Sequence, residues 1–261
     1  MKVTVLGCGG SGGVPLPDGS PGGAWIDCNP AEPRNRRRRV SIVVETRGKV
    51  LLVDAGPDVR EQLLTFAVPP IDAVLLTHWH ADHCHGLDDL RAMAYAKGGQ
   101  IPAYMSAETR RMLTGRFDYM FRHAAPRHQQ YPTILEERTF EYGAFEAEGV
   151  PVRAFCQDHR GVESAGFRFG SFAYSTDAWK LDEAAFAALE GVETWIVDCL
   201  AMKPHPTHSW FEQTMEWIRR VGPKRAYLTH LNHTMDYRRV LALCPEGVEP
   251  AWDGLVLELP E

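Results

Sequence analysis

The sequence predicts an α/β protein in which two β-sheets pack on each other with helices outside, a four-layer αββα sandwich. Strand-like segments come in runs, and helix-like segments occur in both halves of the chain, which is typical of this architecture. Hydrophobic residues make up 44% of the 261 residues, enough for one sizeable core. The sequence has no internal repeat and no low-complexity linker, so residues 1–261 are expected to form a single domain.

The first half is expected to begin with a strand and a long loop. Apolar and polar residues alternate within residues 1–7, which also contain β-branched side chains. Residues 8–39 are instead dense in Gly, Pro and Asp. A hairpin is expected around Arg47-Gly48. A later helix has Asp58 as its predicted N-cap and Glu61 three residues on. The remaining strands of this half are predicted at 40–46, 49–53 and 71–77, and its helices at 58–67 and 87–97.

Residues 98–137 are rich in aromatic residues and arginine, with a helix predicted near 107–121. This segment is interpreted as a lid, a dimer face or simply a packed insertion. The second half returns to strands interspersed with helices. Its strands are predicted at 150–156, 166–169, 171–176, 194–200, 225–229 and 254–259, and its helices at 181–190, 210–221 and 236–243.

The composition and charge of the chain exclude several classes of protein. The net charge is −6 and the pI is about 6.0, which argues against a protein that mainly coats nucleic acid or an anionic membrane. The mean hydropathy of −0.27 is ordinary for a soluble protein, and no apolar run has the length of a membrane span. The first residues are too short an apolar run for a signal peptide, and the six cysteines have no framework spacing. A cytoplasmic protein is therefore expected.

The segment LLTHWHADHCHG, residues 75–86, contains four of the eleven histidines directly after an apolar run. Imidazole nitrogens and a carboxylate suit divalent ions such as zinc and manganese. In an extended segment alternate side chains point the same way, so His78 and His80 can converge on one ion. Asp82 and His83 lie past the turn and can reach a neighbouring position.

One turn cannot complete two metal sites, so further ligands must come from elsewhere. His159, Asp177 and His230 each follow a predicted strand. Strand ends on one edge of a sandwich can meet at one point because the core holds them rigidly. The sequence therefore predicts seven ligands for two divalent ions per chain.

These motifs together resemble the metallo-β-lactamase fold superfamily. Its signature is similar to Thr77-His78-x-His80-x-Asp82-His83, its strand-end Asp motif to Val53-Asp54-Ala55-Gly56, and its later His, Asp and His come in the same order. Other motifs resemble the phosphodiesterase branch that contains phosphoribosyl 1,2-cyclic phosphate phosphodiesterase, with ribonuclease Z as a cousin. These motifs are residues 6–15, 36–39, 83–87 and 229–233.

The resemblance implies a ligand assignment. His78, His80 and His159 would hold one ion, Asp82, His83 and His230 the other, and Asp177 would bridge them. The branch has a catalytic histidine shortly before its last metal ligand, which implies that role for His208, with His205 as the rival. Independently, Ser209 to Glu212 form a capping-box pattern, which would place His208 at a helix N-terminus that favours phosphate.

The chain also departs from that branch. The cysteine cluster that binds a structural zinc there is reduced to Cys28, although His233 stands at the matching place, so a structural zinc is doubtful. His233 is instead expected to contact Cys28, a metal ligand or substrate. Asp54 is expected to hydrogen-bond a ligand histidine. The Arg34–Arg39 run is expected either to pair with acidic residues or to bind substrate phosphate.

The expected function is a metal-dependent phosphodiesterase that cleaves a small cyclic phosphate or nucleotide-like diester with a hydroxide bridging two metal ions. Asp82, Asp177 and His208 are the expected catalytic residues. The alternatives are a tRNA 3′-processing endonuclease like ribonuclease Z, a thioester or lactam hydrolase, and a non-catalytic nucleotide-binding relative.

The expected partners are a small phosphorylated substrate and a second copy in a homodimer, with neither membrane nor nucleic acid. The sequence leaves open the physiological substrate and the metal used in the cell.

Overall fold

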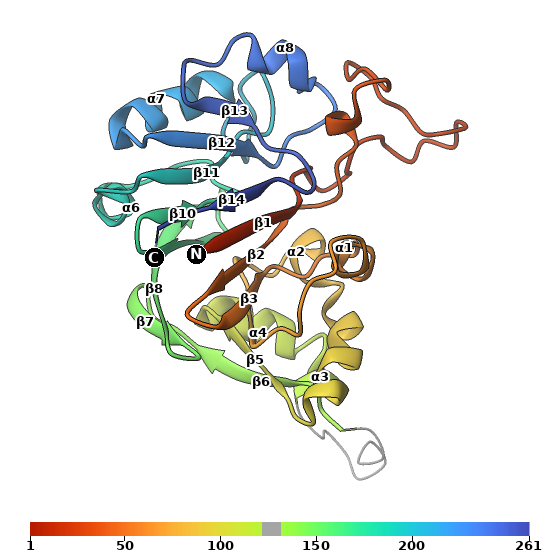
Figure 1. The fold of residues 1–261 in the computed structure, drawn as a ribbon, viewed down its shortest axis with the longest axis vertical. Coiled ribbons are helices and arrows are strands. Elements are labelled where there is room, and N and C mark those ends of the chain that lie inside the picture. Colours follow the sequence, from red (N-terminus) through yellow and green to blue (C-terminus); the bar gives the residue numbers. More distant parts are fainter. Residues whose placement is uncertain (122–131, 261) are drawn as a thin grey trace.

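The computed structural model describes residues 1–121 and 132–260, and within them two β-sheets of seven strands each face one another (Figure 1). The first sheet has the order β14 (Val256–Glu258), β1 (Lys2–Gly7), β2 (Ser41–Thr46), β3 (Lys49–Val53), β4 (Ala73–Leu75), β5 (Ile101–Met105) and β6 (Leu135–Thr139). The second sheet has the order β13 (Val248–Pro250), β12 (Arg225–Thr229), β11 (Thr194–Asp198), β10 (Phe172–Tyr174), β9 (Glu163–Phe169), β8 (Val150–Asp158) and β7 (Gly143–Ala147).

Helices cover the outer face of each sheet. The first sheet carries α1 (Val59–Thr65), α2 (Ala81–Cys84), α3 (Arg91–Lys97), α4 (Ala107–Thr114) and α5 (Asp118–Phe121), with a short 3₁₀ turn at Leu87–Leu90. A second 3₁₀ turn, Pro33–Asn35, lies in the N-terminal loop, where Asn35 donates to the Asp236 side chain and accepts from the Tyr237 backbone N–H. The second sheet carries α6 (Glu183–Leu189), α7 (Phe211–Val221) and α8 (Tyr237–Leu241). The predicted four-layer sandwich is confirmed.

Strand alternation builds the three apolar layers between these elements. Val44 and Leu51 point into the core between the sheets, whereas their neighbours Val43 and Leu52 point towards the helices of the first sheet. In the second sheet Trp195 likewise faces the helices. Every one of these side chains is at most 1% exposed, which is why the central strands read as nearly continuous apolar runs.

The two sheets share a pattern of strand pairing. In the first sheet, β3, β4, β5 and β6 are parallel, and the hairpin of β2 and β3 around Arg47-Gly48 is antiparallel as predicted. In the second sheet, β10, β11, β12 and β13 are parallel. Parallel strands place their carboxyl ends at one edge, and that edge holds the site. The C-terminal strand β14 returns to pair with β1 beside the N-terminus (Figure 1).

Several element predictions were incomplete or wrong. The strands β5, β6, β7 and β13 were not predicted, and the helix expected over 107–121 is divided into α4 and α5. Residues 122–131 of the proposed lid or dimer-face segment lie outside the described residues, so that interpretation stays a prediction. No helix in the described part of the chain is long and apolar enough to cross a membrane.

One of the two predicted helix caps is confirmed. Asp58 is the N-cap residue of α1 as predicted, but its side chain makes no capping hydrogen bond, because its carboxylate accepts from the Arg39 backbone N–H at 2.8 Å and pairs with the Arg39 side chain. Ser209 is not the cap of α7. Its hydroxyl donates to the Asp198 backbone oxygen and side chain, and Trp210 takes the cap position without a side-chain hydrogen bond.

Candidate metal centre

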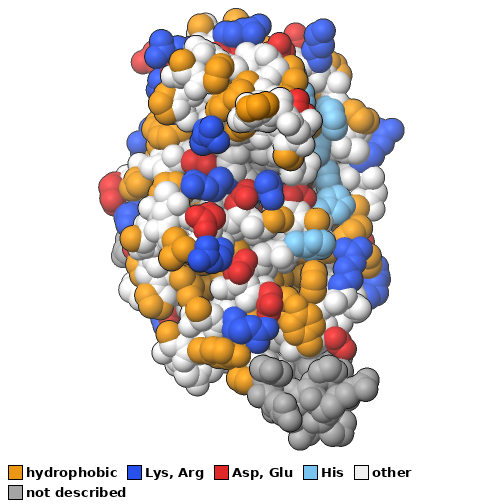
Figure 2. All heavy atoms as spheres, turned by 90° about the vertical axis from the view of Figure 1, so that its right-hand side faces the viewer, with side chains coloured by type: hydrophobic (Ala, Val, Ile, Leu, Met, Phe, Trp, Pro, Cys, Tyr) orange, Lys and Arg blue, Asp and Glu red, His pale blue; other side chains and the backbone are white. Residues whose placement is uncertain are grey.

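The predicted ligands converge where strands of the two sheets end. His78 and His80 follow β4, and Asp82 and His83 lie in the short helix α2. The second sheet contributes the residues that follow β8, β10 and β12, namely His159, Asp177 and His230. Figure 2 shows histidine side chains following one another along this side of the surface, next to arginine and lysine side chains. The site therefore lies between the two halves of the sandwich.

Sharp backbone turns aim three of these side chains. Asp54, Asp177 and His230 have φ values of 62°, 54° and 59°, in the left-handed region that side chains other than glycine rarely adopt. Asp54 follows β3, so each of the three turns occurs just after a strand. Backbone strain of this kind costs about 1–3 kcal/mol per residue and concentrates at functional sites.

The ligand atoms form two clusters. In each cluster one nitrogen or oxygen atom per residue lies within 4.8 Å of the others. The first cluster is His78, His80 and His159, and the second is Asp82, His83, Asp177 and His230.

Asp177 stands between the clusters with one oxygen towards each. Its Oδ1 lies 3.9 Å from His78 Nε2 and 3.7 Å from His159 Nε2. Its Oδ2 lies 3.1 Å from His83 Nε2 and 3.5 Å from His230 Nε2. A carboxylate in this position can serve two cations at once.

The opposite ring nitrogens explain why Nε2 is the atom left for a ligand. His159 Nδ1 lies 2.8 Å from the Thr207 backbone oxygen, which can only accept, so Nδ1 carries a proton and Nε2 keeps its lone pair. His83 Nδ1 lies 2.7 Å from Asp54 Oδ2, and His78 Nδ1 lies 3.1 Å from Thr77 Oγ1.

Buried polar atoms without partners show that the site fits metal ions. The Nε2 atoms of His78, His83 and His230 are buried and have no hydrogen-bond partner of suitable geometry in the described part of the chain. An unpartnered buried nitrogen is costly, and a metal ion accepts its lone pair. Neutral imidazoles with carboxylates are a donor set that divalent zinc or manganese accepts.

The pKa shifts differ between the two clusters. Burial disfavours charge on His83 and His230, but the carboxylates around them outweigh that effect and raise the pKa of both rings, so a metal ion would displace their protons. Burial, together with the charge of His83, lowers the pKa of His78 well below its usual value, which favours the neutral ring that binds metal. Burial by itself raises the pKa of Asp177. The charges of His230 and His83 outweigh that effect and hold its pKa well below the usual range. Asp177 is therefore a carboxylate in the folded protein.

His208 lies beside both clusters. Its Nδ1 is 3.7 Å from Asp177 Oδ1, and its ring centre is 4.6 Å from that of His159 and 4.7 Å from that of His230. The side chain is 12% exposed, so solvent and small molecules can reach it. His205 lies further out, with its ring centre 5.3 Å from that of His208.

The sequence reasoning missed Asp198, at the end of β11. Its side chain is fully buried, with Oδ1 3.5 Å from His230 Nδ1 and 3.9 Å from His208 Nδ1. The same Oδ1 accepts from the Asp177 backbone N–H, and Oδ2 accepts from Ser209. Its position at the end of a buried strand, as for the other site residues, was the signal that could have found it.

Other predicted contacts lie outside the clusters. Neither Cys28 nor His233 belongs to a candidate metal group within the described residues. Cys28 is buried, and the His233 backbone oxygen accepts from the Asp27 N–H. The loop that carries Cys28 is thus hydrogen-bonded to the His233 backbone through Asp27.

Most side chains of the arginine run, Arg34–Arg39, contact other residues of this chain. Arg37 donates to the backbone oxygens of Asn232 and Met235, and Arg38 pairs with Asp253. Arg36 lies over the ring of Trp25. The pairing with acidic residues expected for this run is present at Arg34, Arg38 and Arg39.

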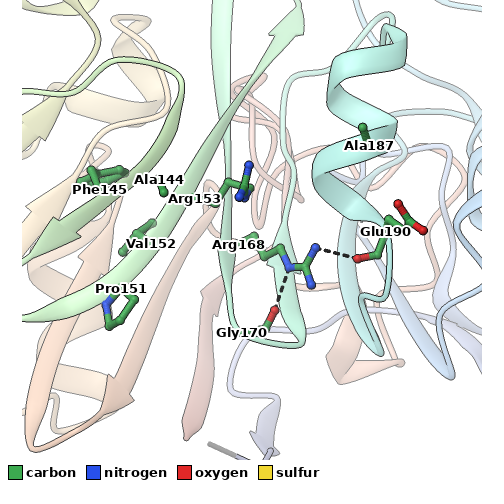
Figure 3. A pocket seen from close by; sticks show the side chains of 9 residues that line it. All are labelled: Ala144, Phe145, Pro151, Val152, Arg153, Arg168, Gly170, Ala187 and Glu190. Atoms are coloured by element: carbon green, nitrogen blue, oxygen red, sulfur yellow. Dashed lines mark hydrogen bonds between the residues drawn. The ribbon is translucent and has the colours of Figure 1, made fainter.

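A separate surface pocket of about 480 Å³ lies between β7, β8, β9 and α6 (Figure 3). Arg168 lines it and donates to the backbone oxygens of Gly170, Ala188 and Glu190. Arg168 thus holds the end of α6 against the sheet. None of the residues that line the pocket belongs to either cluster.

The fold and the paired histidine–aspartate clusters define a metallo-hydrolase of the β-lactamase type. The chain matches the family model described as the β-lactamase superfamily domain over residues 49–231, and it belongs to that superfamily. The predicted membership is confirmed.

A solved structure, described as a new diphosphatase from the PhnP family, is 34% identical with a TM-score of 0.88, covering 99% of this chain and 98% of its own. Zinc-bound PqqB from Methylobacterium extorquens shares the fold at 21% identity, with a TM-score of 0.73. The match covers 99% of this chain and 100% of that structure.

Curated relatives have varied names. An octanoyltransferase of Porphyromonas gingivalis is 28% identical over 98% of this chain and 51% of its own length. A ribonuclease Z of Treponema pallidum is 26% identical over 61% of this chain and 44% of its own. The chain thus spans about half the length of these two relatives. The anti-Pycsar protein Apyc1 of Paenibacillus harenae is 27% identical over 74% of this chain and 83% of its own length.

Proposed function

We propose that the protein is a metal-dependent phosphodiesterase that acts on a small cyclic phosphate or a nucleotide-like diester. The observation that carries this proposal is Asp177, whose two oxygens face two separate histidine clusters. His78, His80 and His159 would hold one divalent ion. Asp82, His83 and His230 would hold a second, with Asp177 shared between them. When bound, such ions supply the positive charge that activates water and neutralises phosphoryl oxygens.

The residues of the chain provide the rest of the chemistry. Asp177 and Asp82 supply negative charge that offsets the repulsion between two cations. His208 Nδ1 faces the carboxylates of Asp177 and Asp198, so the proton that reaches a leaving oxygen would be held at Nε2 of this ring. A phosphodiester needs positive charge near its phosphoryl oxygens because it is itself negatively charged. It also needs a proton donor because its leaving group is poor.

The size and charge of the substrate are argued from the chain as a whole. A net charge of −6 disfavours a long polyanion such as tRNA, whose binding depends on many phosphate contacts. The similarity to the PhnP-family diphosphatase supports a second candidate, hydrolysis of the phosphoanhydride bond of a small diphosphate. Both candidates use the same site and a small anionic substrate.

Activity and metal content measured on one preparation test this proposal. The substrates are bis(p-nitrophenyl) phosphate, cyclic ribose phosphates, a dinucleoside diphosphate, a precursor tRNA and a chromogenic lactam. We expect turnover of the small phosphate esters by protein that holds about two metal ions per chain. Asp177→Ala should abolish turnover, and His208→Ala should reduce kcat by about 10²–10⁴ without loss of metal.

His85→Ala is the matched control, because His85 is an exposed histidine of the same turn and packs against Phe117. It should keep full activity. Turnover of tRNA or lactam in place of small phosphate esters would contradict the proposal, as would an active Asp177→Ala variant.

A further inference from the structure

Two arginines lie next to each other in the surface pocket between β7, β8, β9 and α6 (Figure 3). Arg153 of β8 and Arg168 of β9 are direct partners in the antiparallel pairing of these strands, so their side chains leave the same face of the sheet. Like charges at opposite positions of two strands destabilise a sheet. This pair therefore costs stability unless a negative charge offsets it.

The described part of the chain neutralises the pair incompletely. Arg168 donates to three backbone oxygens, which are polar but carry no net charge. Arg153 is exposed and forms no hydrogen bond or ion pair with a described residue. Glu190 supplies the one carboxylate among the residues that line the pocket, and within the described chain it forms an ion pair with neither guanidinium group. Positive charge therefore remains in excess.

The pKa of Arg168 reflects this surplus of charge. Burial lowers its pKa, and the charge of Arg153 lowers it further, whereas the charge of Glu190 acts in the opposite direction. The guanidinium of Arg168 is held in place by its backbone hydrogen bonds and cannot turn away from its neighbour.

Small residues leave space beside the arginine pair. Ala144 is the β7 partner of Arg153, and Ala187 of α6 lies across the pocket (Figure 3). The apolar part of the wall consists of Phe145, Pro151 and Val152. The volume of about 480 Å³ lies within the range of about 300–1,000 Å³ that is typical of sites for small molecules.

We propose that this pocket binds a small organic anion, with its charged group beside Arg153 and Arg168 and its apolar part against the wall formed by β7 and β8. A phosphate, phosphonate or carboxylate accepts two hydrogen bonds from a guanidinium group in a bidentate arrangement. Arg153 offers such a group without a competing partner, and Arg168 adds charge from a fixed position.

The proposed site is separate from the metal centre. None of the residues that line it belongs to either cluster. His159 follows the strand that carries Arg153, and six residues of extended chain span about 20 Å. Binding at the two places is therefore measurable independently.

Binding of phenylphosphonate to the metal-loaded full-length protein tests this proposal. This probe joins an anionic phosphonate to an apolar ring and has no ester bond that the proposed activity would hydrolyse. Titration calorimetry measures its dissociation constant, and methylphosphonate and benzyl alcohol are the probes that keep only the charge or only the ring. We expect saturable binding of phenylphosphonate and at least about tenfold weaker binding of the other two.

Variants of the pocket locate the bound probe. Arg153→Gln should weaken the binding at least about tenfold, because a charge-assisted hydrogen-bonded pair is lost. Ala144→Glu should abolish it, since a carboxylate opposite Arg153 would take the place of the anion. Arg219→Gln is the matched control: Arg219 is an exposed arginine of α7 that does not line the pocket, and its variant should bind as the wild type does.

Asp177→Ala separates the pocket from the metal centre, because binding at the pocket should persist in this variant. Circular dichroism checks the fold of every variant, and chelator-treated wild-type protein replaces Asp177→Ala if that variant does not fold.

The same variants allow a second measurement without any ligand. Arg153→Gln removes the repulsion from Arg168, and Ala144→Glu offsets it, so both should raise the urea midpoint of unfolding above that of the wild type. Arg219→Gln should leave the midpoint unchanged.

Several results would overturn the proposal. They are an affinity for phenylphosphonate that Arg153→Gln does not change, binding that disappears in Asp177→Ala, and no saturable binding at millimolar concentration. Methylphosphonate that binds as tightly as phenylphosphonate would refute the apolar half of the site, and a lowered urea midpoint in Arg153→Gln would refute the repulsion behind it. None of these outcomes depends on phosphodiester turnover, so the proposed function stands or falls separately.

Discussion

At the scale of single residues, Glu32 connects the N-terminal loop to α8. Its carboxylate accepts from Arg34 Nε at 2.7 Å and from Arg238 Nε at 2.6 Å, across 206 residues of sequence. These hydrogen bonds, that from Arg34 first, lower the pKa of Glu32 to about 2. The carboxylate itself is only 2% exposed, whereas Arg238 is 75% exposed, so solvent weakens that pair.

This pKa shift predicts a pH dependence of stability. Because the folded pKa lies below the unfolded value of about 4.3, the contribution of Glu32 is complete above that pH and is lost as the pH falls towards 2. Glu32→Gln should lower the free energy of unfolding by about 1 kcal/mol at pH 7, with a difference that shrinks below pH 4. Urea unfolding at several pH values measures it.

Glu45→Gln is the control for that prediction, since it removes the ion pair of a more exposed carboxylate with Lys2. Its effect should be smaller than that of Glu32→Gln at neutral pH. A Glu32→Gln effect that is the same at pH 3 and pH 7 would show that the ion pairs are not its cause.

At the scale of elements, the turn after β3 fits directly against α2. The Ala55 N–H donates to the His83 backbone oxygen at 2.8 Å, and the Gly86 N–H donates to the Ala55 backbone oxygen at 2.8 Å. A Cβ on Gly56 would lie 1.9 Å from the Asp82 backbone oxygen. Glycine at this position is therefore what allows the strand-end Asp turn to approach the helix that carries two of the proposed ligands.

Gly56→Ala should accordingly displace α2. We expect a loss of about 1–3 kcal/mol in the free energy of unfolding, together with reduced metal content, because backbone atoms must move. Gly99→Ala is the matched control, since a Cβ there has no neighbour within 4 Å. The two variants are compared by urea unfolding and metal analysis, and equal stability would argue against this account of the turn.

The element scale also shows which strands a sequence pattern can reveal. β6, β7 and β13 are edge strands, and charged residues such as Glu136, Glu146 and Glu249 interrupt their apolar pattern. β5 contains Pro102, which weakens a strand prediction. An edge strand has one paired side and needs little apolar surface, so its signal in the sequence is weak. Apart from β5, the strands that lie inside the two sheets were found.

At the scale of the whole molecule, the proposed centre joins the two sheets. His78, His80, Asp82 and His83 belong to the first half, and His159, Asp177 and His230 to the second. Ions bound between them would connect the halves and favour the folded state, because the unfolded chain cannot present the ligands together.

Removal of metal should therefore lower the thermal stability. With free metal at about 100 times its dissociation constant, one site adds about 2.7 kcal/mol, which corresponds to roughly 5–10 °C in Tm. Calorimetry on chelator-treated and reloaded protein measures the difference. Asp177→Ala should show little response to the chelator, and a wild-type Tm that does not change on reloading would contradict a metal centre between the sheets.

The sequence by itself determined the fold class, the superfamily and the residue types at the strand ends, because buried strands and a histidine-rich turn are local patterns. Only the tertiary structure decided which atoms meet. The two faces of Asp177, the place of His208 between the clusters and the carboxylate of Asp198 behind His230 depend on the order of strands in two sheets. That order joins residues as far apart in the chain as Asp82 and His230, and no local pattern records such a distance.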